Sequence, residues 1–482
     1  MEDFRPVGYV VGLLVMTLGL TMVAPLMVDL AEGREHWPVF VESALLSVLV
    51  GGLVALACRN AAGEGLTVRQ AFLLTTTVWA VLPLFGALPF MLGATRASFT
   101  DAYFEAMSGL TTTGTTVFEG LDDLPRGLLL WRGILQWLGG LGIVIVALVF
   151  LPIMRVGGMQ FFTSEGFDTL GKVLPRAVDI SRGVLDVYLL LTAACILTYV
   201  LLGVPFFDAI VHAMTTVSTG GFSTRDASFG TFGAAAQYAA ILFMVLASVP
   251  FVRLMQGVKG DLRPLLRDDQ IRAYLLWILA ALGFLVLHEL VARGGIDEAA
   301  LRLRLFNLVS IFSGTGYGDG DITAWGTGPF VVLILVGIIG GCTGSTACSV
   351  KVFRYQILFG AIESQMRRIF NPHGVFVLRH GGRRVEEDVL SSVMALLTLF
   401  ILLFGLFIVA LDLTGLSFTE SVTAAWTSLF CIGPAFGPGV GPTGAVDAFP
   451  AAAKWLMSLA MLAGRLEVVS VVVMLLPVFW RD

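Results

Sequence analysis

Ten apolar stretches constrain this chain more than any other feature of its sequence. A helix needs about 20 apolar residues to cross the hydrocarbon core of a bilayer. Stretches of that kind run over residues 7–30, 37–58, 70–93, 127–153, 183–203, 232–252, 271–292, 327–350, 388–412 and 452–479. Charged residues make up only 13% of the 482 residues, against roughly 25% in soluble domains. The sequence therefore predicts an all-α integral membrane protein with ten transmembrane helices.

The basic residues predict how these helices are oriented. Arg and Lys are concentrated in the cytoplasmic loops of membrane proteins. With the N-terminus inside, the inner connections carry about twice as many Arg and Lys residues as the outer ones. The first apolar stretch follows Glu2 and Asp3 rather than a basic leader, so we interpret it as a retained helix and not as a signal peptide. We expect a multi-pass protein with both termini in the cytosol.

Composition excludes several classes of site. The net charge of −5 gives no indication of a nucleic-acid partner. The cysteines show no ligand-like spacing, so neither a disulfide framework nor a zinc site is expected, and we expect no covalent cofactor. They are Cys58, Cys195, Cys342, Cys348 and Cys431.

Four outer connections resemble one another, which indicates an internal repeat. They read DAYFEAMSGLTTTGTT (101–116), DAIVHAMTTVSTGGFS (208–223), LRLFNLVSIFSGTGYGDG (303–320) and ESVTAAWTSLFCIGPAFG (420–437). When they are aligned, one position is occupied by Ser108, Thr215, Ser310 and Thr427. A glycine stands six residues later in every copy, at Gly114, Gly221, Gly316 and Gly433. An acid opens three copies and is predicted to cap a short helix there; these acids are Asp101, Asp208 and Glu420.

These segments are too short to cross the membrane, so each is predicted to enter it and return. Irregular backbone at membrane depth is tolerated only inside protein or along a water-filled cavity. Glycine permits the backbone conformations that turn carbonyls toward a common axis, and rings of carbonyls can replace the hydration shell of a cation. We therefore predict four re-entrant pore-helix and filter loops around a central pore, with cation permeation and no covalent chemistry.

The third copy indicates which cation. Residues 314–320, GTGYGDG, resemble the potassium-channel filter signature. Further motifs are LLLWRGILQWLGGLGIVIV (128–146), HAMTTVSTGGFSTRDAS (212–228), IGGCTGSTACSVKVFR (339–354) and AGRLEVVSVVVMLLPVFW (463–480). With SGLTTTGTT (108–116), they resemble the Trk/Ktr/HKT superfamily of potassium transporters nearly end to end, and specifically its TrkH/TrkG-type membrane subunit. The two helices before the first repeat fit that type.

The resemblance implies potassium uptake through the cell inner membrane, with rubidium and, weakly, sodium as further candidate cargoes. It also implies a homodimer with one pore per protomer, and a cytosolic nucleotide-binding regulatory subunit of the TrkA type. The expected units are two N-terminal helices (1–60) and four pore repeats, at 61–156, 157–258, 259–356 and 357–482. The second helix of the third repeat is expected to be broken.

The candidate potassium filter consists of residues whose backbone carbonyls are expected to hold the ion. They are Thr111, Thr112, Thr113, Gly114, Ser218, Thr219, Gly220, Gly221, Ser313, Gly314, Thr315, Gly316, Cys431, Ile432 and Gly433. Compared with the family pattern, Cys431 stands where asparagine is typical. Ala347, Cys348 and Ser349 stand where a glycine run is usual.

A candidate gate follows the third filter segment. An apolar run there meets several glycines, each of which disfavours a helix by about 1 kcal/mol relative to alanine. Arg465 lies in an apolar stretch, where a charge is expensive and indicates function. The expected gate residues are Gly340, Gly341, Gly344, Ser345, Thr346, Lys351 and Arg465.

Several alternatives stay open at this point. Gly139, Gly140 and Gly142 are interpreted as packing positions between helices. Glu105, His212 and Asn307 share one aligned position and either tune the field behind the filter or hydrogen-bond the loop backbone. Acids after the filters either concentrate cations or are ordinary loop charges; they are Glu119, Asp122, Asp123, Asp226, Asp319, Asp321 and Asp447. An intramembrane enzyme is disfavoured because no nucleophile–base pair or metal cluster is visible, and a secondary carrier of another fold because the repeats share one orientation.

Overall fold

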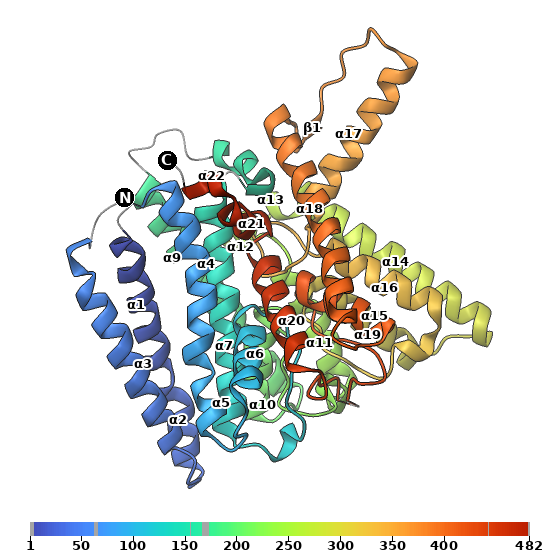
Figure 1. The fold of residues 1–482 in the computed structure, drawn as a ribbon. Coiled ribbons are helices and arrows are strands. Elements are labelled where there is room, and N and C mark those ends of the chain that lie inside the picture. The colour runs from blue at the N-terminus through green and yellow to red at the C-terminus, as the bar shows by residue number, and fades with distance from the viewer. Residues whose placement is uncertain (1–3, 62–65, 155, 166–172, 442, 481–482) are drawn as a thin grey trace.

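The computed structural model describes residues 4–61, 66–154, 156–165, 173–441 and 443–480. Helices form almost all of its regular structure (Figure 1). The first half contains α1 (Arg5–Thr21), α2 (Val23–Ala31), α3 (Pro38–Ala57), α4 (Val68–Gly86), α5 (Leu88–Leu92), α6 (Phe99–Leu110), α7 (Arg126–Ile145), α8 (Leu151–Met154), α9 (Val173–Leu201), α10 (Phe206–Val217), α11 (Ala234–Ala247), α12 (Phe251–Val258) and α13 (Arg263–Arg267).

The second half contains α14 (Asp269–Arg293), α15 (Glu298–Ser313), α16 (Thr327–Ile339), α17 (Val352–Phe370), α18 (Glu387–Asp412), α19 (Phe418–Phe430), α20 (Ala451–Arg465), α21 (Val469–Leu475) and α22 (Pro477–Trp480). A small antiparallel hairpin is made by β1 (Arg379–His380) and β2 (Arg383–Arg384). Short 3-10 turns occur at Arg59–Ala61, Leu121–Asp123, Val156–Glu165, Ser228–Thr231 and Thr323–Trp325, and a π-helical turn at Val146–Phe150.

The helices are those of a multi-spanning membrane protein. Within the described ranges, seven helices are long and apolar enough to cross a membrane, and nine if each of two bent pairs is one span. The predicted count of ten transmembrane helices, one of them broken, is therefore not reached by long helices alone. In the predicted stretch 327–350, α16 has only 13 residues because the chain leaves the helix at Gly340, where φ is +74°.

Two further breaks were not expected from the sequence. α11 and α12 are bent by 104° at Pro250, which has no N–H to continue a helix. α20 and α21 are bent by 110°, and Glu467 and Val468 between them have left-handed φ angles of +57° and +50°. Both places lie inside the predicted apolar stretches 232–252 and 452–479, so the length of an apolar stretch alone does not reveal them.

Four short helices occupy equivalent places among the long ones. Each packs against the helix before it and the helix after it in the chain: α6 between α4 and α7, α10 between α9 and α11, α15 between α14 and α16, and α19 between α18 and α20. Each also packs against the second long helix of the preceding unit, through the pairs α7–α10, α11–α15, α16–α19 and α20–α6. The fourth pair returns to the first unit, so the four units close into a ring. α1 packs on α3 and α4, beside this ring.

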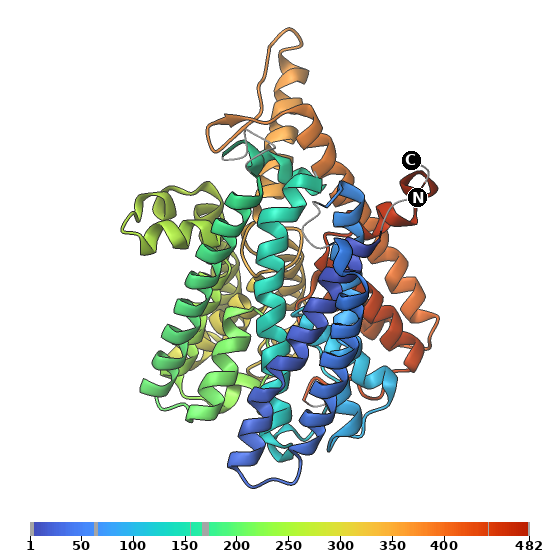
Figure 2. The same cartoon turned by 90° about the vertical axis from the view of Figure 1, so that its left-hand side faces the viewer.

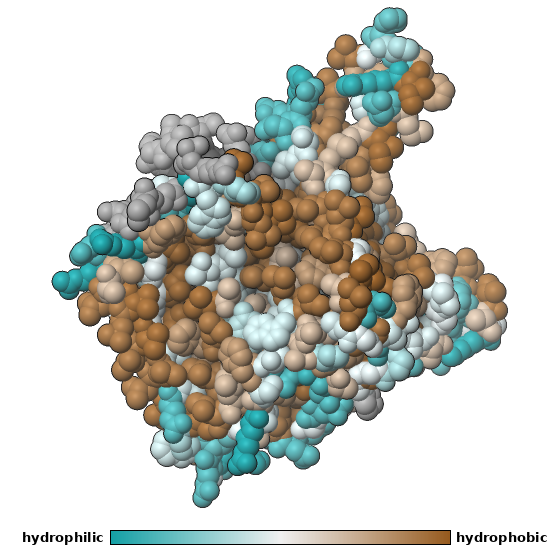
Figure 3. Space-filling model, in the orientation of Figure 1, coloured by the Kyte–Doolittle hydropathy of each residue, from teal (hydrophilic) through white to brown (hydrophobic). Residues whose placement is uncertain are grey.

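The surface is divided as a membrane requires. A broad apolar zone covers the long helices, and polar residues gather toward the two ends (Figure 3). At one end, α17 and the β1–β2 hairpin project beyond the other helices, and the described ends of the chain lie toward the same side (Figures 1 and 2). α13, with its basic Arg263 and Arg267, also lies at this end.

Candidate functional site

The four segments that follow the short helices share one backbone conformation. A residue with left-handed φ ends each helix: Thr112 (+53°), Thr219 (+51°), Gly314 (+74°) and Cys431 (+51°). Two positions later, the aligned glycines also have positive φ: Gly114 (+88°), Gly221 (+79°), Gly316 (+80°) and Gly433 (+115°). The residue between them donates its amide to the carbonyl five residues earlier, at 2.9 Å in the first segment (Thr113 to Ser108), 2.8 Å in the second, 2.9 Å in the third and 3.1 Å in the fourth.

The aligned glycines bring neighbouring segments into contact. A Cβ atom added to Gly114 would overlap the carbonyl oxygen of Gly220, one on Gly221 that of Thr315, and one on Gly316 that of Ile432. At Gly433 the added atom would lie 2.9 Å from Gly316 Cα and 3.3 Å from the carbonyl oxygen of Thr113. The contacts run from first to second, second to third, third to fourth and fourth back to first. The four segments therefore surround one axis, and no side chain fits at these positions.

The beginnings of the short helices correct one prediction. The acids expected to cap α6 and α19 lie three residues inside those helices, and Ser98 and Ser417 are the caps. Glu420 completes a capping box by accepting the Ser417 amide at 2.7 Å. A serine stands three positions before each of these acids, so its hydroxyl reaches the orphan amide first. α10 begins at Phe206, after Pro205, without a side-chain cap, so the expected cap Asp208 is also wrong. Asp297 caps α15.

Polar side chains tie neighbouring segments together. The Gln136 amide of α7 donates to the Gly220 carbonyl at 2.6 Å and accepts the Phe222 amide at 2.9 Å, so it clamps the second segment on both sides of Gly221. The Tyr317 hydroxyl of the third segment donates to the His212 carbonyl of α10 at 3.0 Å. Sequence reasoning did not identify either role, although an amide inside an apolar stretch, as at Gln136, is a usable signal.

The residues Glu105, His212 and Asn307 hold the loops that return from the ring. Glu105 accepts the Val117 amide at 2.9 Å and the Arg132 Nε at 2.7 Å. His212 Nδ1 donates to the Asp208 carbonyl at 2.8 Å, and its Nε2 is 2.9 Å from the Ser223 hydroxyl. Asn307 donates to the Asp319 carbonyl at 2.8 Å. In the fourth unit Thr423, one position earlier, plays this part by donating to the Phe436 carbonyl at 2.8 Å.

These contacts favour the loop-holding interpretation of the shared polar position. They also show that Arg132 is buried, because its side chain is 1% exposed and paired with Glu105. Such a buried pair fixes the first segment to α7, and removal of either partner would leave an uncompensated charge.

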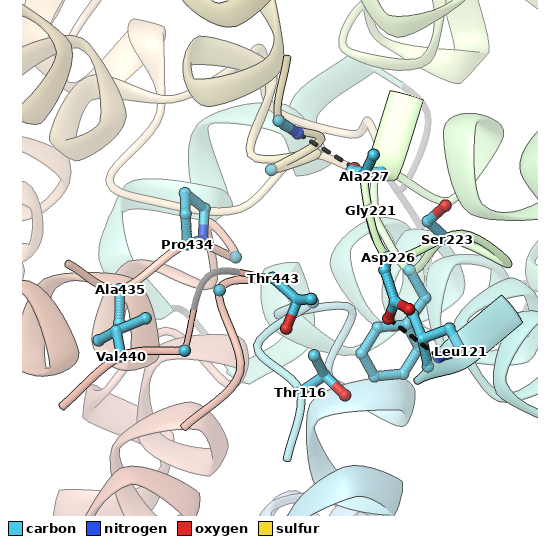
Figure 4. A pocket seen from close by; sticks show the side chains of 18 of the residues that line it. Thr116, Leu121, Gly221, Ser223, Asp226, Ala227, Pro434, Ala435, Val440 and Thr443 are labelled. Atoms are coloured by element: carbon cyan, nitrogen blue, oxygen red, sulfur yellow. Dashed lines mark hydrogen bonds between the residues drawn. The ribbon is translucent and has the colours of Figure 1, made fainter. Parts of the chain in front are cut away.

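A cavity of about 580 Å³ opens beside the ring (Figure 4). All four segments line it, through Gly114 and Thr116, Gly221 and Ser223, Gly316 and Gly318, and Gly433 and Pro434. Among the seven acids singled out in the sequence, Asp226 and Asp321 line this cavity. The Thr323 hydroxyl donates to Asp321 at 2.6 Å and holds the pKa of that carboxyl below its usual range. Asp122 instead bonds Arg225 at 3.1 Å.

On the other side of the ring, residues 346–349 lie against the C-terminal ends of α10 and α19 and against the first and third segments. The Thr346 hydroxyl donates to the Val217 carbonyl of α10 at 3.1 Å. Cys348 Sγ lies 3.9 Å from Thr112 Oγ1, and its backbone nitrogen is 3.6 Å from where a Cβ atom of Gly314 would lie. The Ser349 hydroxyl donates to the Phe430 carbonyl of α19 at 3.1 Å. This non-helical stretch between α16 and α17 therefore lies across the inner end of the ring.

Arg465 links this stretch to two other units. Its guanidinium donates to the Thr346 carbonyl at 3.4 Å and to the Gly139 carbonyl at 3.3 Å, and it also contacts Cys348 Sγ. Glu467, two residues on, does not pair with it but with Arg354. Arg354 also donates to the Val350 carbonyl at 2.8 Å, so the pair anchors the end of the stretch. Lys351 is buried beside them, with φ at +81°.

The glycines interpreted as packing positions do pack closely. A Cβ atom on Gly139 would overlap the Leu110 carbonyl of α6, and one on Gly140 would lie 2.6 Å from Ser218 Cβ. A Cβ atom on Gly464 would likewise overlap the Leu429 carbonyl of α19. Gly142 is less constrained, since the nearest atom belongs to Trp79 at 3.7 Å. α7 and α20 approach their short helices closely because these positions lack side chains.

Side-chain metal ligands do not gather anywhere in the described chain. No group of three or more His, Cys, Asp or Glu residues there could hold a metal ion.

Comparison with known proteins decides the family. A family model described as TrkH, cation transport protein, matches residues 36–478. The chain belongs to this TrkH family. It is therefore a transporter and not an enzyme.

Several relatives of the TrkH family match over their full length. The chain is 37% identical to the Trk system potassium uptake protein TrkI of Halomonas elongata, covering 100% of this chain and 98% of the relative. It is 33% identical to the Trk system potassium uptake protein TrkH of Escherichia coli, covering 99% and 100%. The crystal structure of the potassium transporter TrkH from Vibrio parahaemolyticus matches with a TM-score of 0.91 at 31% identity, over 100% of both chains.

Proposed function

We propose that this TrkH-family protein takes up potassium ions along the axis of the four-segment ring. The relatives named above are potassium uptake proteins, and the matching crystal structure is that of a potassium transporter. The observation that carries the proposal is the closed sequence of contacts at Gly114, Gly221, Gly316 and Gly433. Backbone carbonyls around such an axis can replace the hydration shell of a monovalent cation. The fifteen filter residues expected from the sequence lie in these segments.

The outer approach to this path is the cavity lined by Asp226 and Asp321. Because the pKa of Asp321 is lowered by its bonds to Thr323, this carboxylate stays charged in mildly acidic surroundings. Two arginines also line the cavity, but both are paired with acids, Arg132 with Glu105 and Arg225 with Asp122 and Asp208. The carboxylates of Asp226 and Asp321 can therefore still raise the local concentration of cations. The cavity is thus suited to collect potassium before it enters the ring.

The inner end is closed by a gate formed by residues 340–351 and Arg465. Support comes from the contacts of residues 346–349 with the first and third segments and with the ends of α10 and α19, and from the bonds of Arg465 to Thr346 and Gly139. Ser349 has φ at +70°, a conformation that costs a non-glycine residue of order 1–3 kcal/mol. Opening would release that strain, whereas the hydrogen bonds of Ser349 to Gly337 and Phe430 oppose it.

The proposed topology has ten crossings and four re-entrant loops. The seven long helices, the two bent pairs and α16 with its non-helical continuation supply the crossings. The short helices α6, α10, α15 and α19 with their following segments supply the loops. The proposed units remain 1–60, 61–156, 157–258, 259–356 and 357–482, because each of the last four contains one short helix between two long ones.

We place the protein in the cell inner membrane, with α13, α17 and both termini on the cytosolic side. All four segments of the ring belong to one chain, so each protomer of the proposed homodimer has its own pore. α17 projects beyond the other helices (Figure 1) and exposes Phe359, Ile362, Met366, Ile369 and Phe370, by between 48% and 81%. Apolar side chains at that place favour a protein partner, since a helix beyond the bundle is not covered by lipid.

A growth assay tests the transport function. The chain is expressed in a bacterium that lacks its own potassium uptake systems, and growth is measured at low external potassium. We expect rescue by the wild type, and no rescue by Gly316→Val, whose side chain would overlap the Ile432 carbonyl. Gly318→Val, two residues away and with nothing within 4 Å, is the matched control and should rescue. Membrane expression of each variant is quantified. If the wild type is well expressed together with its regulatory partner and still does not restore growth, the proposal is contradicted.

A second experiment tests regulation by a cytosolic nucleotide-binding subunit. Charge reversal at Arg267 and Arg367, both on the proposed cytosolic side, should weaken co-purification of that subunit. Arg126→Glu, an exposed arginine at the start of α7 that pairs with Glu32, is the control and should leave it unchanged. If the subunit binds the charge-reversed proteins as well as it binds the wild type and the control, the interface lies elsewhere.

A further inference from the structure

Two of the five cysteines lie side by side at the inner end of the ring. Cys348 belongs to the stretch between α16 and α17, and Cys431 ends α19. The bond from the Ser349 hydroxyl to the Phe430 carbonyl, at 3.1 Å, holds the two neighbouring residues together. The Cys431 thiol donates to the Ser428 carbonyl at 3.6 Å and to the Met461 carbonyl at 3.8 Å, one helical turn before Arg465, whose guanidinium contacts Cys348 Sγ. Both are free thiols.

The pair lies directly against the proposed ion path. Cys348 Sγ is 3.9 Å from Thr112 Oγ1 of the first segment. A Cβ atom on Gly314 of the third segment would lie 3.3 Å from the Cys431 carbonyl oxygen and 3.9 Å from Cys348 Cβ. A cation that moved inward along the ring would therefore pass the Cys431 carbonyl and the Cys348 thiol.

A buried positive charge stands beside the pair without an acidic partner. Arg465 contacts Cys348 Sγ, and Arg465 is only 3% exposed. Within the described ranges it forms no salt bridge, and its Nε has no hydrogen-bond partner. Glu467 is occupied by Arg354. Since a buried cation without a counter-ion is costly, this place favours a bound group with net negative charge.

We propose that Cys348 and Cys431 form a binding site for a soft monovalent cation of the silver(I) or copper(I) class, and that its occupation blocks the ion path. Sulfur ligands select copper(I) over the hard cations that prefer oxygen. Each thiol loses its proton on binding, so two thiolates and one monovalent cation together carry one negative charge, which the guanidinium of Arg465 neutralises.

Other metals fit this pair less well. Zinc in a structural site takes four protein ligands, and no group of three or more His, Cys, Asp or Glu residues lies within the described ranges. Calcium takes six to eight oxygen ligands. The monovalent charge also matters, because the proposed path to the pair passes through a ring suited to monovalent cations.

Binding to the thiol pair can be tested apart from transport. Purified full-length protein is loaded with silver nitrate in chloride-free buffer that contains a small monothiol as competitor, which removes silver held by single cysteines. After gel filtration, bound silver is measured by elemental analysis. We expect one silver ion per chain in the wild type and in Cys342→Ser, which lacks a buried thiol of the same stretch, and none in Cys348→Ser or Cys431→Ser. Equal silver content in all four proteins would overturn the site.

Blocking is tested in liposomes by rubidium flux, and this part rests on the proposed function. For each protein, the silver concentration that halves its own silver-free flux is determined. Each serine variant of the pair should need at least about tenfold more silver, since even loss of an outer partner of a metal ligand costs 10–100-fold in affinity. Cys342→Ser should match the wild type. Silver binding without any difference in block would overturn the blocking role, whereas absence of flux in every protein, with silver binding intact, would count against the proposed function and not against the site.

Discussion

Replacement of Gly221 by alanine tests whether the close approach of neighbouring segments determines ion selectivity. Gly221 has φ at +79°, and a Cβ atom there would overlap the Thr315 carbonyl of the next segment. Two penalties are therefore expected. The left-handed conformation costs an L-residue roughly 1–2 kcal/mol, and the overlap must be relieved by displacement of a carbonyl that belongs to the proposed filter.

Gly120 separates these two penalties. It also has positive φ, at +68°, and it lies in the loop after the first segment, but nothing is within 4 Å of an added Cβ atom. Gly120→Ala therefore carries the conformational cost alone. If displacement of the Thr315 carbonyl weakens potassium binding relative to sodium by about 1.4 kcal/mol, the selectivity ratio falls by about tenfold.

The assay is relative permeability to potassium and sodium, measured with purified protein in liposomes at matched protein density. We expect Gly221→Ala to lose at least about tenfold in the potassium-to-sodium ratio and Gly120→Ala to keep the wild-type ratio. Thermal unfolding of both variants, followed in detergent, controls for the shared conformational cost. An unchanged ratio in Gly221→Ala, or an equal loss in Gly120→Ala, would refute the reasoning.

Three further predictions concern the surroundings of the ring. Gln136→Leu leaves the buried Phe222 amide without its acceptor, a loss of about 1–3 kcal/mol, and should lower the potassium-to-sodium ratio in the same liposome assay. Arg465→Ala, or deletion of residues 345–349, should raise rubidium flux in the absence of any partner; flux equal to wild type in both would place the gate elsewhere. Asp321→Asn should slow uptake most at low ionic strength, because salt screens the charge; a slowing that is independent of salt would speak against cation collection.

The repeat was predictable because glycine spacing reports backbone conformation directly. Four glycines in one register correspond to four backbones with the same positive φ, since few other residues adopt that conformation at low cost. The glycines after Ile339 likewise coincide with the end of α16. Other details depend on contacts between distant residues. The link from Gln136 to the second segment spans 84 and 86 residues, and no local pattern contains it.

Charges were the least predictable feature. The sequence does not distinguish a charged residue exposed to water or lipid headgroups from one buried in an ion pair. Arg132 is buried with Glu105, and Arg354 with Glu467. Position in an apolar stretch singled out Arg465, which the structure surrounds with carbonyls and a thiol. The same reasoning could have singled out Arg132, which stands between LLLW and GILQW. Arg354 stood beyond the end of its apolar stretch, and only the fold shows that it is buried.

The two ends of the ring differ in symmetry, and this difference bears on gating. Toward the cavity, the four segments are alike in backbone angles and hydrogen bonds. Toward the inner end, the units differ from one another in backbone structure. The first has a π-helical turn, the second a bend at Pro250 and the fourth a bend at Glu467. Within the described ranges, only the third inserts a stretch that contacts all four units, and that stretch continues directly into α17 at Val352. α17 is also the helix that projects farthest from the bundle (Figure 1), so a protein that bound and moved α17 would pull on residues 346–349 through a continuous backbone.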